Sequence, residues 1–243
     1  MIATNRKGIN ALLLAAGYGK RLRPLTLNTP KCLIKIGGVT MLEKWLIHLE
    51  EIFAEEVIVN THYLHTKVKE FIQLRKSNKI LIRESYEEKL LGTAGTLIKN
   101  KEFFDKKIGL LIHCDNYTNI SLNGLIEAHN NRPKYCLLTM LTFRTNNPKS
   151  CGILKTNEIG VVEEFYEKNE NPPGNLANGA VYAFDPALID WISKNNPNAN
   201  DFSLDIIPHL LGKIYTWHIN SDFVDIGTIE SYERAKLIAN KYK

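Results

Sequence analysis

The stretch over residues 10–38 constrains the fold of this chain most strongly. Its apolar run at 11–16 predicts a buried strand, and two glycines, Gly17 and Gly19, follow directly. Glycine lets the backbone approach a ligand closely because it has no Cβ atom. The stretch also carries four cations: Lys20, Arg21, Arg23 and Lys31. Exposed N–H groups in a loop that leads into a helix bind phosphate well, so the pattern predicts a strand, a phosphate loop and the start of a basic helix.

Two common phosphate-binding motifs do not fit this stretch. The Rossmann motif requires a third glycine three positions after Gly19, where the chain has Leu22. The Walker motif requires Gly-Lys followed by Ser or Thr, and Arg21 stands at that position. The missing third glycine disfavours an NAD-dependent oxidoreductase.

A third pattern fits along its whole length. Residues 14–26, LAAGYGKRLRPLT, and the later pair Pro30-Lys31 resemble the signature of the sugar-1-phosphate nucleotidyltransferases. These enzymes join a nucleoside triphosphate to a sugar 1-phosphate and release pyrophosphate. The resemblance implies that Arg21 binds the leaving phosphates and that Lys31 binds the α-phosphate region, as the catalytic residues. It also implies a nucleotide-binding loop made of Leu14, Ala15, Ala16, Gly17, Gly19, Lys20 and Arg21.

The size and charge of the chain fit an enzyme that handles anionic small molecules. Its 243 residues lie within the range of one large α/β domain. A net charge of +5 is modest and does not demand nucleic acid. No stretch alternates aromatic and basic residues in the pattern that binds single-stranded nucleic acid. The charge therefore predicts no nucleic acid, and the resemblance implies a nucleoside triphosphate and a sugar 1-phosphate as partners.

The sequence predicts a cytoplasmic protein without a membrane partner. Residues 1–9 are polar and lack the apolar core of a signal peptide, and no run approaches the length of a membrane span. The four cysteines form no C-x-x-C pair, so free thiols are expected rather than a zinc site or a disulfide framework.

Strands and helices alternate in the first half of the chain. The almost wholly apolar run at 108–113 is typical of the centre of a parallel sheet. Such alternation predicts a doubly wound α/β layer, here a Rossmann-like mixed, mostly parallel central sheet flanked by helices. We expect strands at 11–16, 56–60, 79–83 and 108–113, and helices at 41–53, 66–74 and 95–99.

The regular alternation of strands and helices changes after Arg132, but no linker, repeat or low-complexity segment divides the chain. We expect strands at 135–143, 152–155, 161–166, 180–184 and 215–219, and helices at 188–192, 203–211 and 229–241. The resemblance covers nearly the entire chain and implies a single nucleotidyltransferase catalytic domain over 1–243. It would have a short N-terminal extension at 1–9 and no C-terminal β-helix domain, and it could form a homo-oligomer.

A second set of candidate site residues consists of Glu84 and the motif Gly92-Thr93-Ala94-Gly95, just before an expected helix. Two glycines around small residues would allow a flat base to lie close to the backbone; a plain strand-to-helix turn is the alternative. The segment resembles the purine-recognition segment of mannose-1-phosphate and heptose-1-phosphate guanylyltransferases. The resemblance implies GTP as the favoured nucleotide, a mannose- or heptose-type sugar, and base contacts by Glu84, Gly92 and Thr93.

Asp115 follows the apolar strand at 108–113, within His113-Cys114-Asp115-Asn116. Ligands in open α/β sheets bind beyond the carboxyl ends of the strands, although Asp-Asn after a strand also serves as a turn cap. Glycosyltransferases that use an Asp-x-Asp pair are disfavoured, because Tyr117 stands two positions later. The family resemblance implies that Asp115 binds Mg²⁺.

Asp225 is the expected second Mg²⁺ ligand. It lies in DFVDIGT at 222–228, which resembles the family's Asp-x-Gly-Thr motif, whose first aspartate shares the magnesium ion. Magnesium on a nucleotide is usually held by one or two carboxylates together with phosphates and waters. The alternative is that Asp225 only supports a tight turn into the last helix, for which Thr228 is a good N-cap.

Glu167-Lys168 resembles the Glu-Lys-Pro motif that holds the sugar 1-phosphate, with Glu167 on the sugar hydroxyls and Lys168 on the phosphate. Asn169 replaces the proline of that motif. The resemblance also places Gly152 and Asn178 in the sugar pocket. The alternative for this segment is a charged, solvated hairpin.

The expected reaction needs no protein nucleophile. A sugar phosphate is largely dianionic near neutrality, because the second pKa of a phosphate monoester is about 6. The protein must align two polyanions and accept charge on the leaving pyrophosphate. Two alternatives remain open. One is the same reaction class with dTTP, UTP or CTP and another phosphorylated acceptor, and the other is a non-catalytic regulatory protein that binds nucleotide sugars.

Overall fold

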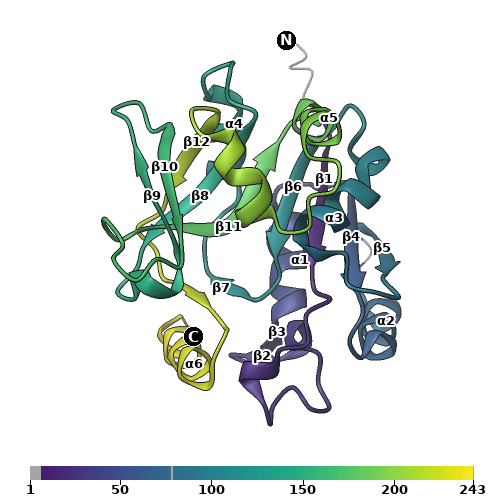
Figure 1. The fold of residues 1–243 in the computed structure, drawn as a ribbon. Coiled ribbons are helices and arrows are strands. Elements are labelled where there is room, and N and C mark those ends of the chain that lie inside the picture. Colours follow the sequence, from purple (N-terminus) through teal and green to yellow (C-terminus); the bar gives the residue numbers. More distant parts are fainter. Residues whose placement is uncertain (1–6, 78, 243) are drawn as a thin grey trace, which may run out of the picture.

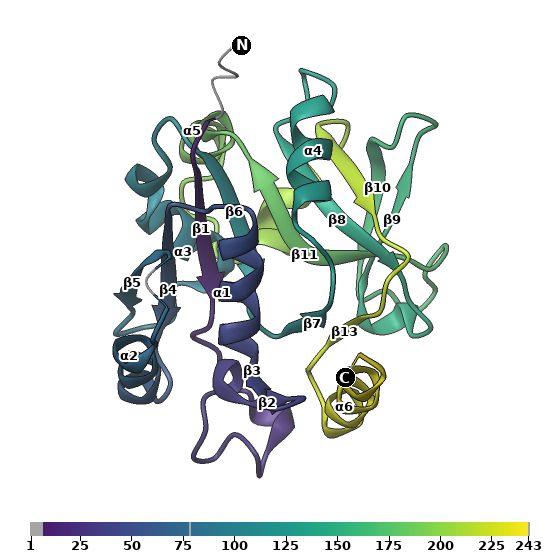
Figure 2. The ribbon, with the colours of Figure 1, turned by 180° about the vertical axis from the view of Figure 1, so that it is seen from behind.

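The computed structural model describes residues 7–77 and 79–242. The expected N-terminal extension at 1–9 lies mostly outside the described residues, and Ile9 already belongs to the first strand. Figure 1 shows a central sheet with helices packed around it, and Figure 2 shows the same ribbon from behind.

Nine strands of the described chain form the central sheet, in the order β10-β9-β11-β6-β1-β4-β5, with β8 paired to β11 and β12 paired to β8. Strands β6, β1, β4 and β5 are parallel to one another, whereas β8, β9, β10 and β11 make antiparallel pairs. The predicted fold class, a Rossmann-like mixed and mostly parallel sheet flanked by helices, is confirmed. The strand bounds are β1 Ile9–Leu14, β4 Glu56–Thr61, β5 Leu81–Tyr86, β6 Ile108–His113, β8 Leu138–Arg144, β9 Gly152–Thr156, β10 Val162–Glu167, β11 Leu176–Phe184 and β12 Ile214–His218.

Strand β1 lies inside the sheet because both of its faces are apolar. Leu12 packs into the core on one face, and Leu13 packs into the core on the other. The neighbouring strands run parallel to it, so that Leu14 lies opposite both Asn60 of β4 and His113 of β6. The carboxyl ends of three strands thus meet at one edge, which is where ligands bind in open α/β sheets.

Helices cover both faces of the sheet (Figures 1 and 2). Helices α1, α2 and α4 contribute to the apolar cluster on one face, which includes Trp45 and Leu125. Helices α3 and α5 contribute to the cluster on the other face, which includes Leu97 and Ile192. The helix bounds are α1 Met41–Glu51, α2 His65–Leu74, α3 Gly92–Lys99, α4 Asn123–Asn131 and α5 Pro186–Asn195.

A third apolar cluster joins the end of the chain to the segment after the first strand. It brings Leu22 and Ile34 together with Val224 and Ala235. The elements around it are the hairpin of β2 (Lys35–Ile36) and β3 (Val39–Thr40), the pair of β7 (Asn116–Thr118) and β13 (Phe223–Asp225), and helix α6 (Ile229–Lys241). Helix α6 begins with a capping box between Thr228 and Ser231, which confirms Thr228 as its N-cap.

Helix α4 and residues 203–211 are two of the segments that differ from the sequence prediction. Helix α4 is not predicted, because its only buried apolar side chain is Leu125 and the apolar periodicity is weak. Residues 203–211, predicted as one helix, form a π-helix at Phe202–Ile206 followed by a 3₁₀ turn at Ile207–Leu210. Pro208 explains the break, because proline has no N–H to donate and clashes with the preceding helical turn.

The cysteines agree with the sequence prediction, since all four are free thiols. Burial raises the pKa of Cys32 to about 12, so this thiol stays protonated and is not a nucleophile. In the described part of the chain, no helix combines the length and the apolar character needed to cross a membrane.

Candidate active site

The glycine loop follows β1 directly. The backbone N–H of Ala15 donates to Oδ1 of Asn60 at 2.6 Å, which ties the start of the loop to β4. Gly19 has a φ of +62°, and a Cβ atom there would lie 2.8 Å from Cγ2 of Thr26. Only glycine fits this position without strain. The Thr26 hydroxyl donates to the Gly19 carbonyl at 2.8 Å and closes the loop.

The basic segment after the loop is shorter than predicted. Lys20–Leu22 forms a single 3₁₀ turn and not the start of an α-helix. Arg23 is extended, with a ψ of 141°, as is usual for a residue that precedes proline, so the turn cannot continue. Lys20 and Arg21 are both exposed on this turn, where an anionic ligand can reach them.

A pocket of about 240 Å³ lies beyond the carboxyl ends of β1, β4 and β6. Six of the predicted nucleotide-binding residues line it: Leu14, Ala15, Ala16, Gly17, Gly92 and Thr93. Lys31 and Asp115 line it as well, whereas Gly19, Lys20 and Arg21 lie outside its lining. The structure thus joins the first two sequence motifs in one cavity.

Glu84 lies outside the lining of this pocket. Its Oε1 accepts a hydrogen bond from the Thr61 hydroxyl at 2.6 Å and lies 3.8 Å from Nδ1 of His65. The carboxylate that does line the pocket belongs to Glu87. Glu84 lies within β5, whereas Glu87 follows the carboxyl end of that strand, where the ligand edge is. The structure therefore gives the pocket position to Glu87 and not to Glu84.

Glu87 organises a buried hydrogen-bond network in the pocket wall. Its exposed fraction is 2%. Its Oε1 accepts from Nδ2 of Asn60 at 3.0 Å and from the Thr96 hydroxyl at 2.5 Å, and its Oε2 accepts from the Leu91 N–H at 3.1 Å. Because Asn60 also accepts from Ala15, the network links the glycine loop to helix α3.

Replacing Glu87 with alanine should lower the free energy of unfolding by about 1–3 kcal/mol, because buried donors lose their acceptor. Nucleotide binding should weaken as well, since the pocket wall loses its support. Urea titration measures the stability. The matched control is Glu88→Ala at the exposed neighbouring position, which should stay within about 0.5 kcal/mol of the parent protein. Equal stability of the two variants would contradict the role given to the network.

The motif Gly92-Thr93-Ala94-Gly95 forms the first turn of α3. The sequence pattern predicts this motif just before the helix, so the helix begins earlier than predicted. Gly92 has a φ of +75°, and a Cβ atom there would lie 2.3 Å from the carbonyl oxygen of Asn200. The Thr93 hydroxyl accepts a hydrogen bond from the Phe202 N–H at 2.7 Å. The motif therefore supports a distant segment of the chain as well as the pocket.

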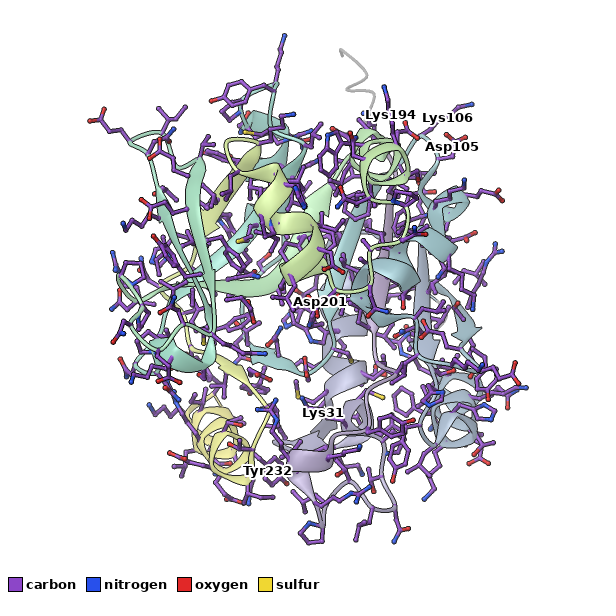
Figure 3. The ribbon with its side chains drawn as sticks, viewed as in Figure 1. Lys31, Asp105, Lys106, Lys194, Asp201 and Tyr232 are labelled. Atoms are coloured by element: carbon purple, nitrogen blue, oxygen red, sulfur yellow. The ribbon has the colours of Figure 1, made fainter. Side chains whose placement is uncertain are left out.

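Lys31, Asp115 and Asp225 meet beside the pocket, although they are far apart in the sequence. Nζ of Lys31 forms an ion pair with Asp115 and lies 3.8 Å from Oδ1 of Asp225. Strand β7 follows Asp115 and β13 ends at Asp225, and the pairing of these strands places Asp225 opposite Asn116. In Figure 3 Lys31 is labelled just above Tyr232, which belongs to α6.

Arg21 belongs to the same cluster. A Cβ atom at Gly227 would lie 3.1 Å from Nη2 of Arg21 and 3.3 Å from Oδ2 of Asp225. The glycine thus leaves room for the guanidinium beside the carboxylate. The structure brings together the two residues predicted to be catalytic and the two predicted to bind the metal.

The two aspartates of the cluster differ in their pKa. Burial raises the pKa of Asp225, and the charge of Asp115 raises it further. Burial acts in the same direction on Asp115, but the charges of Lys31 and His113 outweigh it and hold the pKa of Asp115 below its usual range. Asp115 is therefore ionised, and a cation next to Asp225 would relieve the repulsion between the two carboxylates.

The donor set of the cluster fits a magnesium ion that binds together with a nucleotide. Mg²⁺ takes oxygen ligands, commonly one or two carboxylates with phosphates and waters. Asp115 and Asp225 would supply the two carboxylates. Among residues 7–77 and 79–242, no group of three or more His, Cys, Asp or Glu side chains could hold a metal ion. Phosphate oxygens of a substrate would thus have to complete the coordination.

Glu167 and Lys168 lie at the carboxyl end of β10. A Cβ atom at Gly152 would lie 2.6 Å from Oε2 of Glu167, so the glycine makes room for this carboxylate. Nζ of Lys168 lies 3.5 Å from Oε1 of Glu167. The charge of Lys168 also acts on Asp225 and partly offsets the rise of its pKa. The predicted sugar-phosphate motif therefore faces the charged cluster.

The side chain of Asn178 is held within the protein. Its Nδ2 donates to the Tyr182 hydroxyl at 2.8 Å, and its Oδ1 accepts from the Ala180 N–H at 2.9 Å. Asn178 lies on β11 beside Gly179, where a Cβ atom would lie 2.4 Å from Cδ2 of Leu141. This residue shapes the strand next to the sugar-phosphate motif, and one of its amide hydrogens has no partner among the described residues.

Sequence reasoning missed four polar residues of the pocket: Asn60, Glu87, Thr96 and His113. Nε2 of His113 is buried and has no hydrogen-bond partner within the described residues. Asn60 and His113 lie at or next to the carboxyl ends of β4 and β6. The rule that ligands bind beyond such strand ends is the signal that could have found them.

The strand ends of this mixed α/β sheet carry a glycine loop, clustered cations and two aspartates. These features together define a class of proteins that bind phosphate groups. Residues 10–241 match the family model described as Nucleotidyl transferase. The chain belongs to this family, as the resemblance of its motifs predicts.

Several curated proteins are similar to the chain. A putative mannose-1-phosphate guanyltransferase of Sulfolobus acidocaldarius is 27% identical over 237 residues, which cover 94% of this chain and 62% of that protein. A glucose-1-phosphate adenylyltransferase of Clostridium perfringens is 26% identical over 262 residues, with coverages of 98% and 68%. A mannose-1-phosphate guanylyltransferase of Mycobacterium tuberculosis is 28% identical over 232 residues, with coverages of 93% and 63%. The chain thus spans between 62% and 68% of the length of these relatives.

Solved structures share the fold. The crystal structure of a putative glucose-1-phosphate thymidylyltransferase from Bacillus anthracis in complex with a sucrose has a TM-score of 0.84 and 22% identity, and covers 96% of this chain and 95% of that chain. The structure of HddC from Yersinia pseudotuberculosis complexed with GMP-PN has a TM-score of 0.77 and 22% identity, with coverages of 96% and 99%. At this sequence identity, the structural similarity shows only that the fold is shared.

Proposed function

We propose that the protein is a sugar-1-phosphate nucleotidyltransferase, which joins a nucleoside triphosphate to a sugar 1-phosphate and releases pyrophosphate. The observation that carries this proposal is the cluster in which Lys31 lies between Asp115 and Asp225 beside the pocket. Arg21 and Lys168 bring two further cations to the same place. Cations around two carboxylates suit two polyanionic substrates and a divalent ion.

In the proposed reaction, a phosphate oxygen of the sugar 1-phosphate attacks the α-phosphorus of the nucleoside triphosphate. The new P–O bond forms while the bond to the β-phosphate oxygen breaks, and the electron pair leaves on pyrophosphate. Bound magnesium would neutralise charge on the triphosphate. The protein itself holds the reacting groups in line, which is the main source of catalysis in such transfers.

Three cations have distinct places in this scheme. Lys31 lines the pocket and would neutralise the α-phosphate as its charge grows. Arg21 stands on the exposed turn after the glycine loop and would hold the leaving pyrophosphate. Lys168 directly follows β10, on the side of the sugar motif, and would bind the incoming phosphate. Glu167 would accept hydrogen bonds from the sugar hydroxyls.

The favoured substrates in this proposal are GTP and a mannose- or heptose-type sugar 1-phosphate. The motif Gly92-Thr93-Ala94-Gly95 and the similarity to two mannose-1-phosphate guanylyltransferases support GTP. The sequence predicts a base contact by Glu84, whereas the carboxylate that lines the pocket is Glu87. The second candidate is adenylyl transfer to a glucose-type sugar, which the similar glucose-1-phosphate adenylyltransferase favours.

A substrate panel tests both the proposed reaction class and the proposed preference for GTP. Each of GTP, ATP, UTP, CTP and dTTP is combined with mannose, glucose and heptose 1-phosphates, and pyrophosphate release is followed. We expect release only with both substrates and magnesium, with the highest kcat/KM for GTP. Equal or better turnover with another nucleotide would overturn the preference for GTP. No release with any pair, together with tight binding of a nucleotide sugar, would favour the regulatory protein instead.

A further inference from the structure

The side chain of Tyr18 ties the middle of the glycine loop to the segment that follows β4. Its hydroxyl lies 2.9 Å from Nε2 of His62, and the two rings meet edge to face with their centroids 5.3 Å apart. The Tyr63 ring also packs against Tyr18, with 5.5 Å between the centroids. Because Tyr18 stands between Gly17 and Gly19, it is the side chain through which the protein can hold this part of the loop.

His62 connects Tyr18 to the wall of the nucleotide pocket. Its Nδ1 lies 2.8 Å from the backbone carbonyl oxygen of Glu87, a residue that lines the pocket. A carbonyl oxygen only accepts hydrogen bonds, so Nδ1 carries a hydrogen and donates it. In the neutral imidazole, Nε2 then accepts from the Tyr18 hydroxyl. The hydrogen bonds therefore run from the loop through the imidazole to the pocket wall.

A second route joins the glycine loop to the same residue of the wall. The Ala15 N–H donates to Oδ1 of Asn60, and Nδ2 of Asn60 donates to Oε1 of Glu87. Asn60 lies near the end of β4, and His62 directly follows that strand. The loop is thus attached to Glu87 twice, through Ala15 at its start and through Tyr18 at its middle. Two attachments to one residue fix the orientation of the loop as well as its position.

The outer end of the same segment is held separately. The Tyr63 hydroxyl lies 3.0 Å from the carbonyl oxygens of Thr26 and Leu27. On α2, Nζ of Lys67 donates to the carbonyl oxygen of Asn28. These contacts retain the segment whether or not Tyr18 has its hydroxyl group. Loss of that hydroxyl should therefore change the orientation of the loop without releasing the segment from the protein.

Tyr18 also lies against a cation that the proposed function uses. Nζ of Lys20 is 5.3 Å from the centroid of the Tyr18 ring, within the range of attraction between a cation and an aromatic face. Lys20 shares the exposed turn after the loop with Arg21. The orientation of Tyr18 therefore bears on the loop N–H groups and on the charge that follows them.

We propose that Tyr18 and His62 are positioning residues that set the glycine loop against the triphosphate. This role rests on the part of the proposed function that places the triphosphate at the loop. Among the described residues that line the pocket, neither side chain is present, so both act through the loop and Glu87. A base that seats against Glu87 would then also fix the loop around the phosphates, because one network of hydrogen bonds holds both.

The first test replaces Tyr18 with phenylalanine, which keeps the ring and removes the hydroxyl. Calorimetry measures the Kd of GTP and of GMP, which has the same base and ribose but lacks the β- and γ-phosphates. We expect the Kd of GTP to rise about 3- to 10-fold, as for the loss of one hydrogen bond between uncharged groups. The Kd of GMP should stay within about twofold. If the substrate panel favours another nucleotide, its triphosphate and monophosphate replace this pair.

The control for this variant is Tyr135→Phe, which removes a hydroxyl from another exposed tyrosine and should leave both constants unchanged. A parental Kd of GTP in the Tyr18→Phe protein would overturn the positioning role. Equal losses of affinity for GTP and GMP would overturn it as well, because they would mean that Tyr18 only supports the pocket wall.

The second test asks whether His62 acts through Tyr18. His62→Asn places an amide nitrogen near the position of Nδ1, so it can still donate to the Glu87 carbonyl, but it leaves Tyr18 without its acceptor. We expect the same selective loss of GTP affinity. The double variant Tyr18→Phe/His62→Asn should be no worse than the worse single variant, because both changes remove one interaction. Additive losses would overturn the pairing. His209→Asn, at an exposed position, is the control and should bind both nucleotides as the parent protein does.

Two separate measurements distinguish this role from the proposed function. Pyrophosphate release by the parent protein tests the proposed function, and the ratio of the two dissociation constants tests the role of Tyr18. If the parent protein is active and Tyr18→Phe keeps the parental ratio, the positioning role alone fails. If the parent protein releases no pyrophosphate but Tyr18→Phe selectively loses GTP affinity, the proposed reaction fails and the positioning role stands.

Discussion

Replacing Lys31 with alanine should lower kcat by about 10²- to 10³-fold. The ammonium group lines the nucleotide pocket and contacts both aspartates of the charged cluster. In the proposed reaction it stabilises charge that builds on the α-phosphate in the transition state, so its loss should appear in kcat more than in KM. Initial rates of pyrophosphate release at saturating substrates measure the effect.

The control for this variant is Lys35→Ala, which removes the same charge from an exposed position on β2. It should retain parental turnover. Because Lys31 is partly buried and paired with Asp115, circular dichroism and urea titration must show that the Lys31→Ala protein is folded at the assay temperature. A folded Lys31→Ala protein with near-normal turnover would remove Lys31 from the catalytic residues.

The fold follows from local patterns where an element buries a continuous apolar run. Strand β6 at Ile108–His113 and helix α6 at Ile229–Lys241 have the predicted bounds at both ends. Strands β7 and β13 escape prediction because each has three residues and exists only through its pairing with the other. A pattern of three residues has no measurable period, so only the tertiary contact defines such strands.

The candidate site is predictable where a motif is local. The glycine loop is visible in the sequence itself, and the family resemblance adds Lys31, Asp115 and Asp225; the structure brings these residues together. The predicted base contact by Glu84 shows the limit of this reasoning, because the carboxylate that lines the pocket is Glu87. Both carboxylates lie near the end of β5, and only the end of the strand at Tyr86 decides which one follows it. Strand ends are the least certain part of a sequence prediction.

The place of Asp201 beside the first turn of α3 could not be found from its sequence neighbourhood. Its segment reads as an ordinary turn before a helix, and Asp201 indeed caps the π-helix that follows. The place of this segment depends on the hydrogen bonds of Phe202 with Thr93 and of Asn200 with Ala94, more than a hundred residues earlier. Contacts between distant segments leave no periodic signal in either one, so they become visible only in the folded chain.

Asp225→Asn should lower activity by about 10²-fold or more and raise the magnesium concentration needed for half-maximal rate. The change keeps the shape of the side chain but removes one of the two carboxylates beside Lys31. Initial rates over a magnesium titration, with the nucleotide held in excess, measure both quantities. Asp222→Asn is the matched control, because Asp222 lies three residues away, and its carboxylate contacts the Tyr242 hydroxyl at 3.3 Å.

The direction of the effect follows from the charges around Asp225. Burial and the charge of Asp115 both raise its pKa, which means that its ionised form is unfavourable without a nearby cation. Lys31 is shared with Asp115, and the charges of Lys31, Arg21 and Lys168 offset the rise in the pKa of Asp225 only in part. A divalent ion between the two carboxylates would neutralise both, and the asparagine variant would attract it less strongly. If Asp225→Asn keeps parental activity at low magnesium while remaining folded, Asp225 only supports the turn before α6 and is not a metal ligand.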